Sequence, residues 1–143
     1  MVCAVLTADC LPVLMTDGET IAAIHAGWRG LLGGILTKAL VQIPWRRKPL
    51  VFLGPAISAE VFDVGEEVYR AFLKRSLAFE RGFAKRNGRW YADLYRLAAI
   101  ELRGHGVKAI YGGSWCTYQE EEKFFSYRRD GRCGRMATLI WKR

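Results

Sequence analysis

Cys10 and His25 are the two residues whose types and positions are best suited to chemistry. Asp17-Gly18 separates the apolar runs that contain them, and an Asp-Gly pair in this position is typical of a β-hairpin turn. A two-residue turn places Cys10 directly opposite His25, a four-residue loop makes them diagonal neighbours on one face, and a three-residue loop separates them. The pair could be a nucleophile and its base, or two ligands of a metal such as zinc. The alternative is a chance contact between a buried cysteine and an ordinary histidine.

The loop that begins at His25, with the sequence His-Ala-Gly-Trp-Arg-Gly, could bind an anion. Gly27 and Gly30 allow close approach of the backbone, and the planar guanidinium of Arg29 suits phosphate or carboxylate. The helix expected after the loop would add its N-terminal N–H groups. The simpler interpretation is a plain turn with a surface arginine.

A second candidate segment, residues 124–131, mixes aromatic and basic side chains near the C-terminus. Tyr127 and Arg128 in this segment could form a pocket wall that stacks on a planar ring and pairs with an anion. A core strand followed by a solvated basic turn is the alternative.

Three further residues have less specific signals. Asp9 could orient a partner of Cys10, or it could cap the backbone. We expect His105, between two glycines, to lie on the surface at a helix end, and Cys116 to be a buried structural cysteine. The four cysteines include no CxxC pair, which excludes a zinc ribbon and a thioredoxin-like motif, and we expect free thiols.

Composition indicates one globular unit. A chain of 143 residues with 51% hydrophobic and 25% charged residues is long enough for one core and is not disordered. No apolar run is long enough for a membrane helix and no signal peptide is visible, so we expect a cytoplasmic protein. The net charge of +8 suggests anionic partners. The basic residues are spread in small groups without a known nucleic-acid motif, so a solvated basic surface is favoured and nucleic acid is an unlikely partner.

Apolar periodicity and turn signals predict the elements that must position these residues. We expect strands at 11–15, 20–25, 50–53, 107–111 and 136–141, and helices at 31–43, after 66, and at 91–103. Gly33-Gly34 falls inside the first helix. Pro12 predicts an edge strand or a local irregularity, and Asp63 with Glu66 has the spacing of a capping box. The class is α+β.

Several motifs together resemble a known family. They are Thr7-Ala8-Asp9-Cys10-Leu11-Pro12-Val13, His25-Ala26-Gly27-Trp28-Arg29-Gly30, Leu53-Gly54-Pro55-Ala56-Ile57, Phe62-Asp63-Val64-Gly65, Cys116-Thr117 and Phe125-Ser126-Tyr127-Arg128-Arg129-Asp130. In this order they resemble the bacterial polyphenol oxidase or laccase-like proteins, the YfiH family. The resemblance covers nearly the whole chain, and the ADCLPV and HAGWRG motifs are highly specific.

The resemblance implies mixed β-sheets with packed helices, in a fold shared with deamidases of the cytotoxic-necrotizing-factor type. It implies one domain over residues 1–143 that lacks the family's N-terminal region. It also implies a zinc site formed by one cysteine and two histidines. Cys10 and His25 match two of these ligands, the remaining histidine is expected upstream of this chain, and His105 matches none.

Members of the family are regarded as purine nucleoside phosphorylases that also deaminate adenosine. We therefore expect a zinc-dependent enzyme that binds purine nucleosides and phosphate, with activity impaired by the missing histidine. The catalytic residues would be Cys10, His25 and Arg29, and the zinc ligands would be Cys10 and His25. The substrate-binding residues would be Asp9, Gly27, Trp28, Tyr127 and Arg128.

Four alternatives stay open at this point. A metal-free hydrolase would use Cys10 as its nucleophile and His25 as its base, and would need no missing ligand. Copper-dependent phenol oxidation, the family's older name, is disfavoured because two histidines cannot hold several copper ions. A non-catalytic nucleic-acid module would rely on the positive charge. A role in editing cell-wall precursors has also been attributed to the family.

Overall fold

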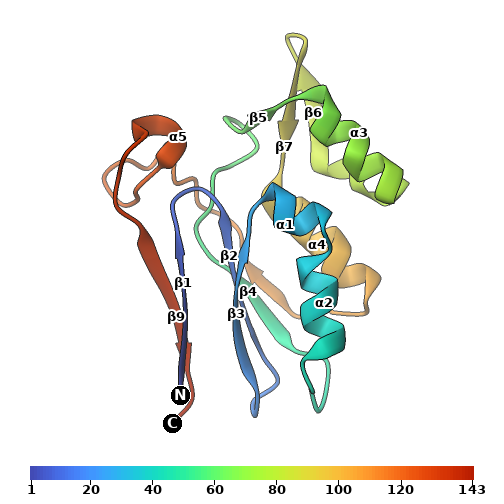
Figure 1. The fold of residues 1–143 in the computed structure, drawn as a ribbon, viewed down its shortest axis with the longest axis vertical. Helices are drawn as coiled ribbons and strands as arrows, with labels where there is room; N and C mark the ends of the chain where they lie inside the picture. Colours follow the sequence, from blue (N-terminus) through green and yellow to red (C-terminus); the bar gives the residue numbers. More distant parts are fainter.

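Nine strands and five α-helices make up the computed structural model, which describes residues 1–143 (Figure 1). The strands are β1 (Val2–Thr7), β2 (Leu11–Thr16), β3 (Ile21–Ala26), β4 (Leu50–Leu53), β5 (Asp63–Val64), β6 (Phe83–Arg86), β7 (Arg89–Ala92), β8 (Ile110–Gly112) and β9 (Met136–Trp141). The helices are α1 (Trp28–Leu32), α2 (Ile35–Gln42), α3 (Glu66–Arg75), α4 (Leu94–Gly104) and α5 (Tyr127–Asp130), with a 3₁₀ helix, η1 (Leu77–Gly82). The predicted α+β class is confirmed.

The central sheet has the strand order β3-β2-β4-β8 and is mixed, because β8 runs parallel to β4 while the other pairs are antiparallel. Helices α1, α2 and α4 lie to one side of it (Figure 1). Val13 and Val51 of the sheet belong to the same buried cluster as Leu36 of α2 and Leu97 of α4. Burial of these side chains between sheet and helices is the main source of stability for this part of the fold.

The β2–β3 hairpin has a four-residue loop, so the two-residue turn is wrong and the diagonal arrangement is confirmed. Pro12 pairs with His25, which leaves Cys10 two residues before that pair, just outside β2. Asp17 explains the wider loop. Its Oδ1 accepts the N–H groups of Glu19 at 2.9 Å and Thr20 at 2.7 Å, so the side chain organises the loop backbone.

The expectation that Pro12 marks an edge strand is wrong, because β2 lies between β3 and β4. Pairing of β4 with β2 stops at Leu53, opposite Val13. Gly54 N–H donates to the Pro12 carbonyl at 2.9 Å, so Pro12 faces β4 where that strand ends. The missing N–H of proline therefore removes no ladder hydrogen bond.

The helix predicted at 31–43 is two helices. Gly34 adopts φ +77°, a left-handed conformation, and separates α1 from α2. The capping box at Asp63 is also wrong: Gly65 is the N-cap of α3, and Asp63 pairs with Tyr91 in the sheet β5-β7-β6. Because Tyr91 is in β7, the helix predicted from residue 91 starts at Leu94.

The first and last strands pair with each other. β1 and β9 form an antiparallel ribbon from Val2 opposite Trp141 to Thr7 opposite Met136. The ribbon runs beside β3, and both chain ends lie at its foot (Figure 1). The ribbon therefore brings Thr7, at the end of β1, next to Met136 and so near the segment that carries α5. None of the helices is both long enough and apolar enough to cross a membrane.

Candidate active site

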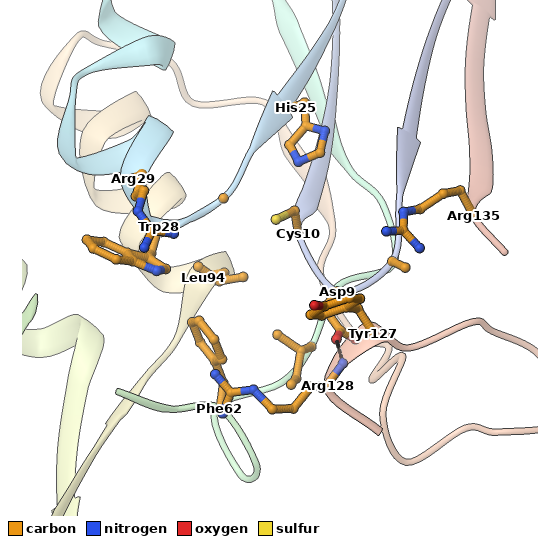
Figure 2. Close-up of a pocket in the computed structure, with 13 residues that line it drawn as sticks. Asp9, Cys10, His25, Trp28, Arg29, Phe62, Leu94, Tyr127, Arg128 and Arg135 are labelled. Carbon is orange, nitrogen blue, oxygen red and sulfur yellow. Dashed lines mark hydrogen bonds between the residues drawn. The ribbon is translucent and has the colours of Figure 1, made fainter. Parts of the chain in front are cut away.

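A cavity of about 330 Å³ lies where the open end of the β2–β3 hairpin meets α1 and α5 (Figure 2). Its lining consists of Ala8, Asp9, Cys10, His25, Gly27, Trp28, Arg29, Ile57, Phe62, Leu94, Tyr127, Arg128 and Arg135. Every residue assigned to the site from sequence is among them. The structure therefore brings together segments that are more than a hundred residues apart in the chain.

Cys10 and His25 lie next to each other at one side of this cavity (Figure 2). The four-residue hairpin loop accounts for this placement, since it keeps both side chains on the same face. The backbone of Gly27 approaches the thiol so closely that a Cβ there would lie 2.9 Å from Cys10 Sγ. Glycine at position 27 therefore leaves the room that the sulfur occupies. No hydrogen bond joins the sulfur to the His25 ring.

The electrostatics of the pocket act on the Cys10 thiol in opposite directions. Burial, and then the negative charge of Asp9, raise the pKa of Cys10 above its ordinary value. The positive charges of Arg135 and Arg29 act the other way and lower that pKa. Because the net direction is upward, the free residue is a thiol at neutral pH.

Asp9 holds the segments that form one wall of the cavity through its hydrogen bonds. Its buried carboxylate accepts the hydroxyl of Thr117 and the backbone N–H of Arg128, each at 2.7 Å. Its carbonyl accepts the N–H of Ile57 at 2.9 Å, and the residue adopts φ +98°. Both carboxylate oxygens therefore hold neighbouring segments in place, and the residue lines the cavity as part of its frame.

The three arginines of the cavity differ in their partners. Arg128 Nη1 lies 2.8 Å from Asp63 Oδ1, so its charge is paired. Arg29 stacks over Trp28 at 4.4 Å and has no carboxylate partner. Arg135 also lacks one. Its Nη1 donates to the Cys133 side chain and to neighbouring carbonyls, and its guanidinium lies 5.8 Å from the centre of the Tyr127 ring. Arg29 and Arg135 are therefore the cations that an incoming anion could pair with.

Sequence reasoning missed the apolar wall and one of the charges. Ile57, Phe62 and Leu94 line the cavity from the β4–β5 loop and the first residue of α4. Arg135, just before β9, enters it from the opposite side to Arg29 (Figure 2). The apolar residues look like ordinary core in the sequence, and Arg135 stands in a run of arginines with no distinguishing signal.

Cys10 and His25 fit as two donors of a metal site, because a thiol and an imidazole share one wall of the cavity. No group of three or more His, Cys, Asp or Glu side chains is placed to hold a metal ion. His105 lies at the end of α4, where its Nε2 is 2.9 Å from Thr37 Oγ1, as expected for a residue outside the site. The chain's own residues therefore provide a partial donor set.

Comparison with known proteins connects this cavity to a family. The model of the family described as multi-copper polyphenol oxidoreductase laccase matches residues 1–143. "Purine nucleoside phosphorylase YfiH" of Shigella flexneri is 48% identical over 145 residues, which cover 98% of this chain and 59% of that protein. The "Purine nucleoside phosphorylase" of Haemophilus influenzae is 45% identical, covering 98% of this chain and 60% of that protein. The chain thus spans about three fifths of the length of these relatives.

Solved structures agree with the sequence comparison. The crystal structure of a Neisseria meningitidis protein, assigned to family DUF152, has a TM-score of 0.92 and 48% identity, covering 98% of this chain and 60% of that one. YlmD from Geobacillus stearothermophilus has a TM-score of 0.84 at 28% identity, covering all of this chain and 57% of that one. The match over the whole chain and the shared fold lead to one conclusion: the chain belongs to the multi-copper polyphenol oxidoreductase laccase family, the family of the YfiH proteins.

Proposed function

We propose that the cavity beside Cys10 binds a purine nucleoside and phosphate and supports phosphorolysis of the nucleoside. The observation that carries this proposal is that one cavity combines two arginines without a carboxylate partner and an apolar wall. Arg29 and Arg135 supply the charge, and Trp28, Phe62 and Leu94 supply the wall. A volume of about 330 Å³ is within the range of small-molecule sites. The names of the relatives at 44–48% identity support the same activity.

The residues would act by holding the reactants in line and by balancing charge. A phosphate oxygen forms a bond to the ribose C1′ while the bond from C1′ to the purine nitrogen breaks, and that nitrogen keeps the electron pair and takes up a proton. Arg29 and Arg135 would bind the phosphate dianion and orient it toward the sugar. Trp28, Phe62 and Leu94 would provide the apolar contacts for the base. The products are ribose 1-phosphate and the free base.

A metal would fit beside the same pocket. Cys10 and His25 would supply two donors to a zinc ion, and the remaining donors would come from water or from groups outside these residues. Zinc at this place would supply a polarised water for deamination of adenosine. The raised pKa of Cys10, caused chiefly by burial, disfavours a free thiolate nucleophile at neutral pH.

The test of phosphorolysis measures inosine cleavage by the purified chain, supplied with zinc, as a function of phosphate concentration. We expect ribose 1-phosphate and hypoxanthine, with the KM for phosphate raised about 10- to 100-fold in Arg29→Gln and Arg135→Gln, the effect of losing a charged hydrogen bond. Arg46→Gln removes an exposed charge elsewhere and serves as the matched control. Cleavage that yields free ribose, or that is indifferent to phosphate, would contradict the proposal.

The metal is tested by elemental analysis of the wild-type chain and of Cys10→Ala. We expect zinc in the wild type and its loss in the variant. If the chain is instead a metal-free hydrolase, it should contain no zinc. Its activity should then be abolished by alkylation of Cys10 and unaffected by a chelator.

A further inference from the structure

A second cavity, separate from the candidate active site, is lined mainly by arginine. It has a volume of about 570 Å³ and lies between η1 and α4. Its lining residues are Ala78, Arg81, Arg96, Ile100, Arg103 and Gly104, and we call it the arginine hollow. It shares no residue with the cavity that contains Cys10. Nothing in the proposed phosphorolysis uses it.

The helix α4 presents one side to this hollow. Arg96, Ile100 and Arg103 follow at intervals of four and three residues, which places their side chains on one face of the helix. Arg81 approaches the same space from η1, at the end of the segment that packs against α4. The opposite face of α4 is buried, with Leu97 and Leu102 in the core, so α4 cannot rotate to turn Arg96 and Arg103 away from Arg81.

The charges in the arginine hollow have no partners within the protein. None of the six ion pairs of the structure involves Arg81, Arg96 or Arg103. No carboxylate is among the lining residues. The single hydrogen bond in this group is a weak one, from Arg96 Nη1 to the Arg81 carbonyl at 3.4 Å. The three side chains are exposed, and three like charges around one space attract an anion that lies between them.

We propose that the arginine hollow binds the phosphoryl groups of a small phosphorylated molecule. A guanidinium presents a planar fork of donors that matches two phosphate oxygens, and three of them offer a charge that suits an oligophosphate better than a single carboxylate. Ile100 gives the hollow an apolar contact for the part of the molecule that carries the phosphates. The concave shape favours a compact ligand over a polymer, which would need a continuous basic track.

The experiment titrates the 143-residue chain with inorganic pyrophosphate and follows arginine side-chain N–H signals by NMR, together with calorimetry. We expect shifts at Arg81, Arg96 and Arg103, and an affinity reduced about tenfold or more in the double variant Arg81→Gln/Arg103→Gln. Neither of these two side chains makes a hydrogen bond in the structure, so the fold should be retained, which a thermal melt verifies. The double variant Arg81→Lys/Arg103→Lys keeps both charges but lacks the planar guanidinium donors, so it should bind pyrophosphate with an intermediate affinity.

Two controls separate this site from the candidate active site and from general charge effects. Arg29→Gln weakens anion binding beside Cys10 and should leave binding in the arginine hollow unchanged. Arg46→Gln removes one exposed charge outside both cavities and should have no effect. The proposal is overturned if the double variant binds pyrophosphate as the wild type does, or if Arg46→Gln loses as much. Tighter binding of a single-stranded oligonucleotide, lost in the same double variant and falling steeply with salt, would also overturn it in favour of a nucleic acid.

Discussion

The carboxylate of Asp9 holds the backbone of Arg128, whose N–H donates to Asp9 Oδ2 at 2.7 Å across 119 residues of sequence. The other oxygen accepts the Thr117 hydroxyl at the same distance. Through these two bonds the residue next to Cys10 fixes the position of α5, and so the wall of the cavity that Tyr127 and Arg128 form. One buried side chain at the start of the β2–β3 hairpin thus holds the C-terminal wall of the cavity.

Asp9→Asn should weaken this connection. The amide nitrogen cannot accept the N–H of Arg128 or the hydroxyl of Thr117, and a charged hydrogen bond contributes about 1.5–3 kcal/mol. We expect the free energy of unfolding to fall by about 1–3 kcal/mol, measured by urea denaturation, and the KM for nucleoside to rise. Asparagine tolerates the positive φ of this position, so backbone strain does not account for the loss. An unchanged denaturation midpoint would show that Asp9 does not anchor α5.

Gly27→Ala should disturb the thiol selectively. The added Cβ would lie 2.9 Å from Cys10 Sγ, while the backbone at φ −78° accepts alanine readily. We expect zinc affinity to fall about 10- to 100-fold, as when a supporting contact of a metal ligand is lost. Gly30→Ala is the matched control, because its Cβ meets only ordinary contacts, with Ile35 at 3.5 Å and the His25 carbonyl at 3.6 Å. Equal affinities in the two variants would contradict the steric argument.

Arg135→Gln should raise the pKa of Cys10 further. Burial and Asp9 already hold that pKa above its ordinary value, and the Arg135 charge opposes them, so its removal adds to the shift. The pH profile of iodoacetamide alkylation at Cys10, followed by mass spectrometry in the absence of metal, should move to higher pH in the variant. Arg46→Gln should leave the profile in place. An unchanged profile would show that Arg135 does not act on the thiolate, and a move to lower pH would reverse the assigned sign.

Asp17→Asn should change how the free energy of unfolding depends on pH under acidic conditions. The backbone N–H of Thr20, with further help from those of Arg46 and Glu19, lowers the pKa of Asp17 to about 2. The unfolded chain has a carboxyl pKa of about 3.9. The ionised group therefore stabilises the fold above pH of about 4, and this contribution is lost as pH falls toward 2. The variant should show a shallower decline of unfolding free energy across this window, and an identical slope would refute the assignment.

The β2–β3 hairpin could be predicted only in part from local sequence signals. Asp17-Gly18 correctly predicts a turn between the two strands, and two loop lengths leave Cys10 and His25 on one face. The choice between them depends on hydrogen bonds of the Asp17 side chain, including one to the N–H of Arg46, 29 residues away. That contact does not exist until the tertiary fold forms. The sequence therefore left two registers possible for the β2–β3 hairpin and could not decide between them.

Interactions that form only in the folded protein also explain the wrong predictions at Gly34 and Asp63. The apolar spacing from Leu31 to Ile43 fits one helix, and only the left-handed backbone at Gly34 divides it. Asp63 has the spacing of a cap, yet its backbone pairs with Tyr91 and its carboxylate binds Arg128. The family motifs predicted the site residues because they carry information about distant segments. Arg135 and Leu94 lie outside those motifs and were missed.

The ribbon of β1 and β9 has a consequence for synthesis. During translation β1 is made well before its partner, residues 136–141. Until then the backbone N–H and C=O groups of Val2 to Thr7 lack their final partners and are open to pairing with other chains. Closure of the ribbon therefore has to wait for residues 136–141, and a ribosome that stalls before residue 136 holds a chain in which β1 is an unpaired strand.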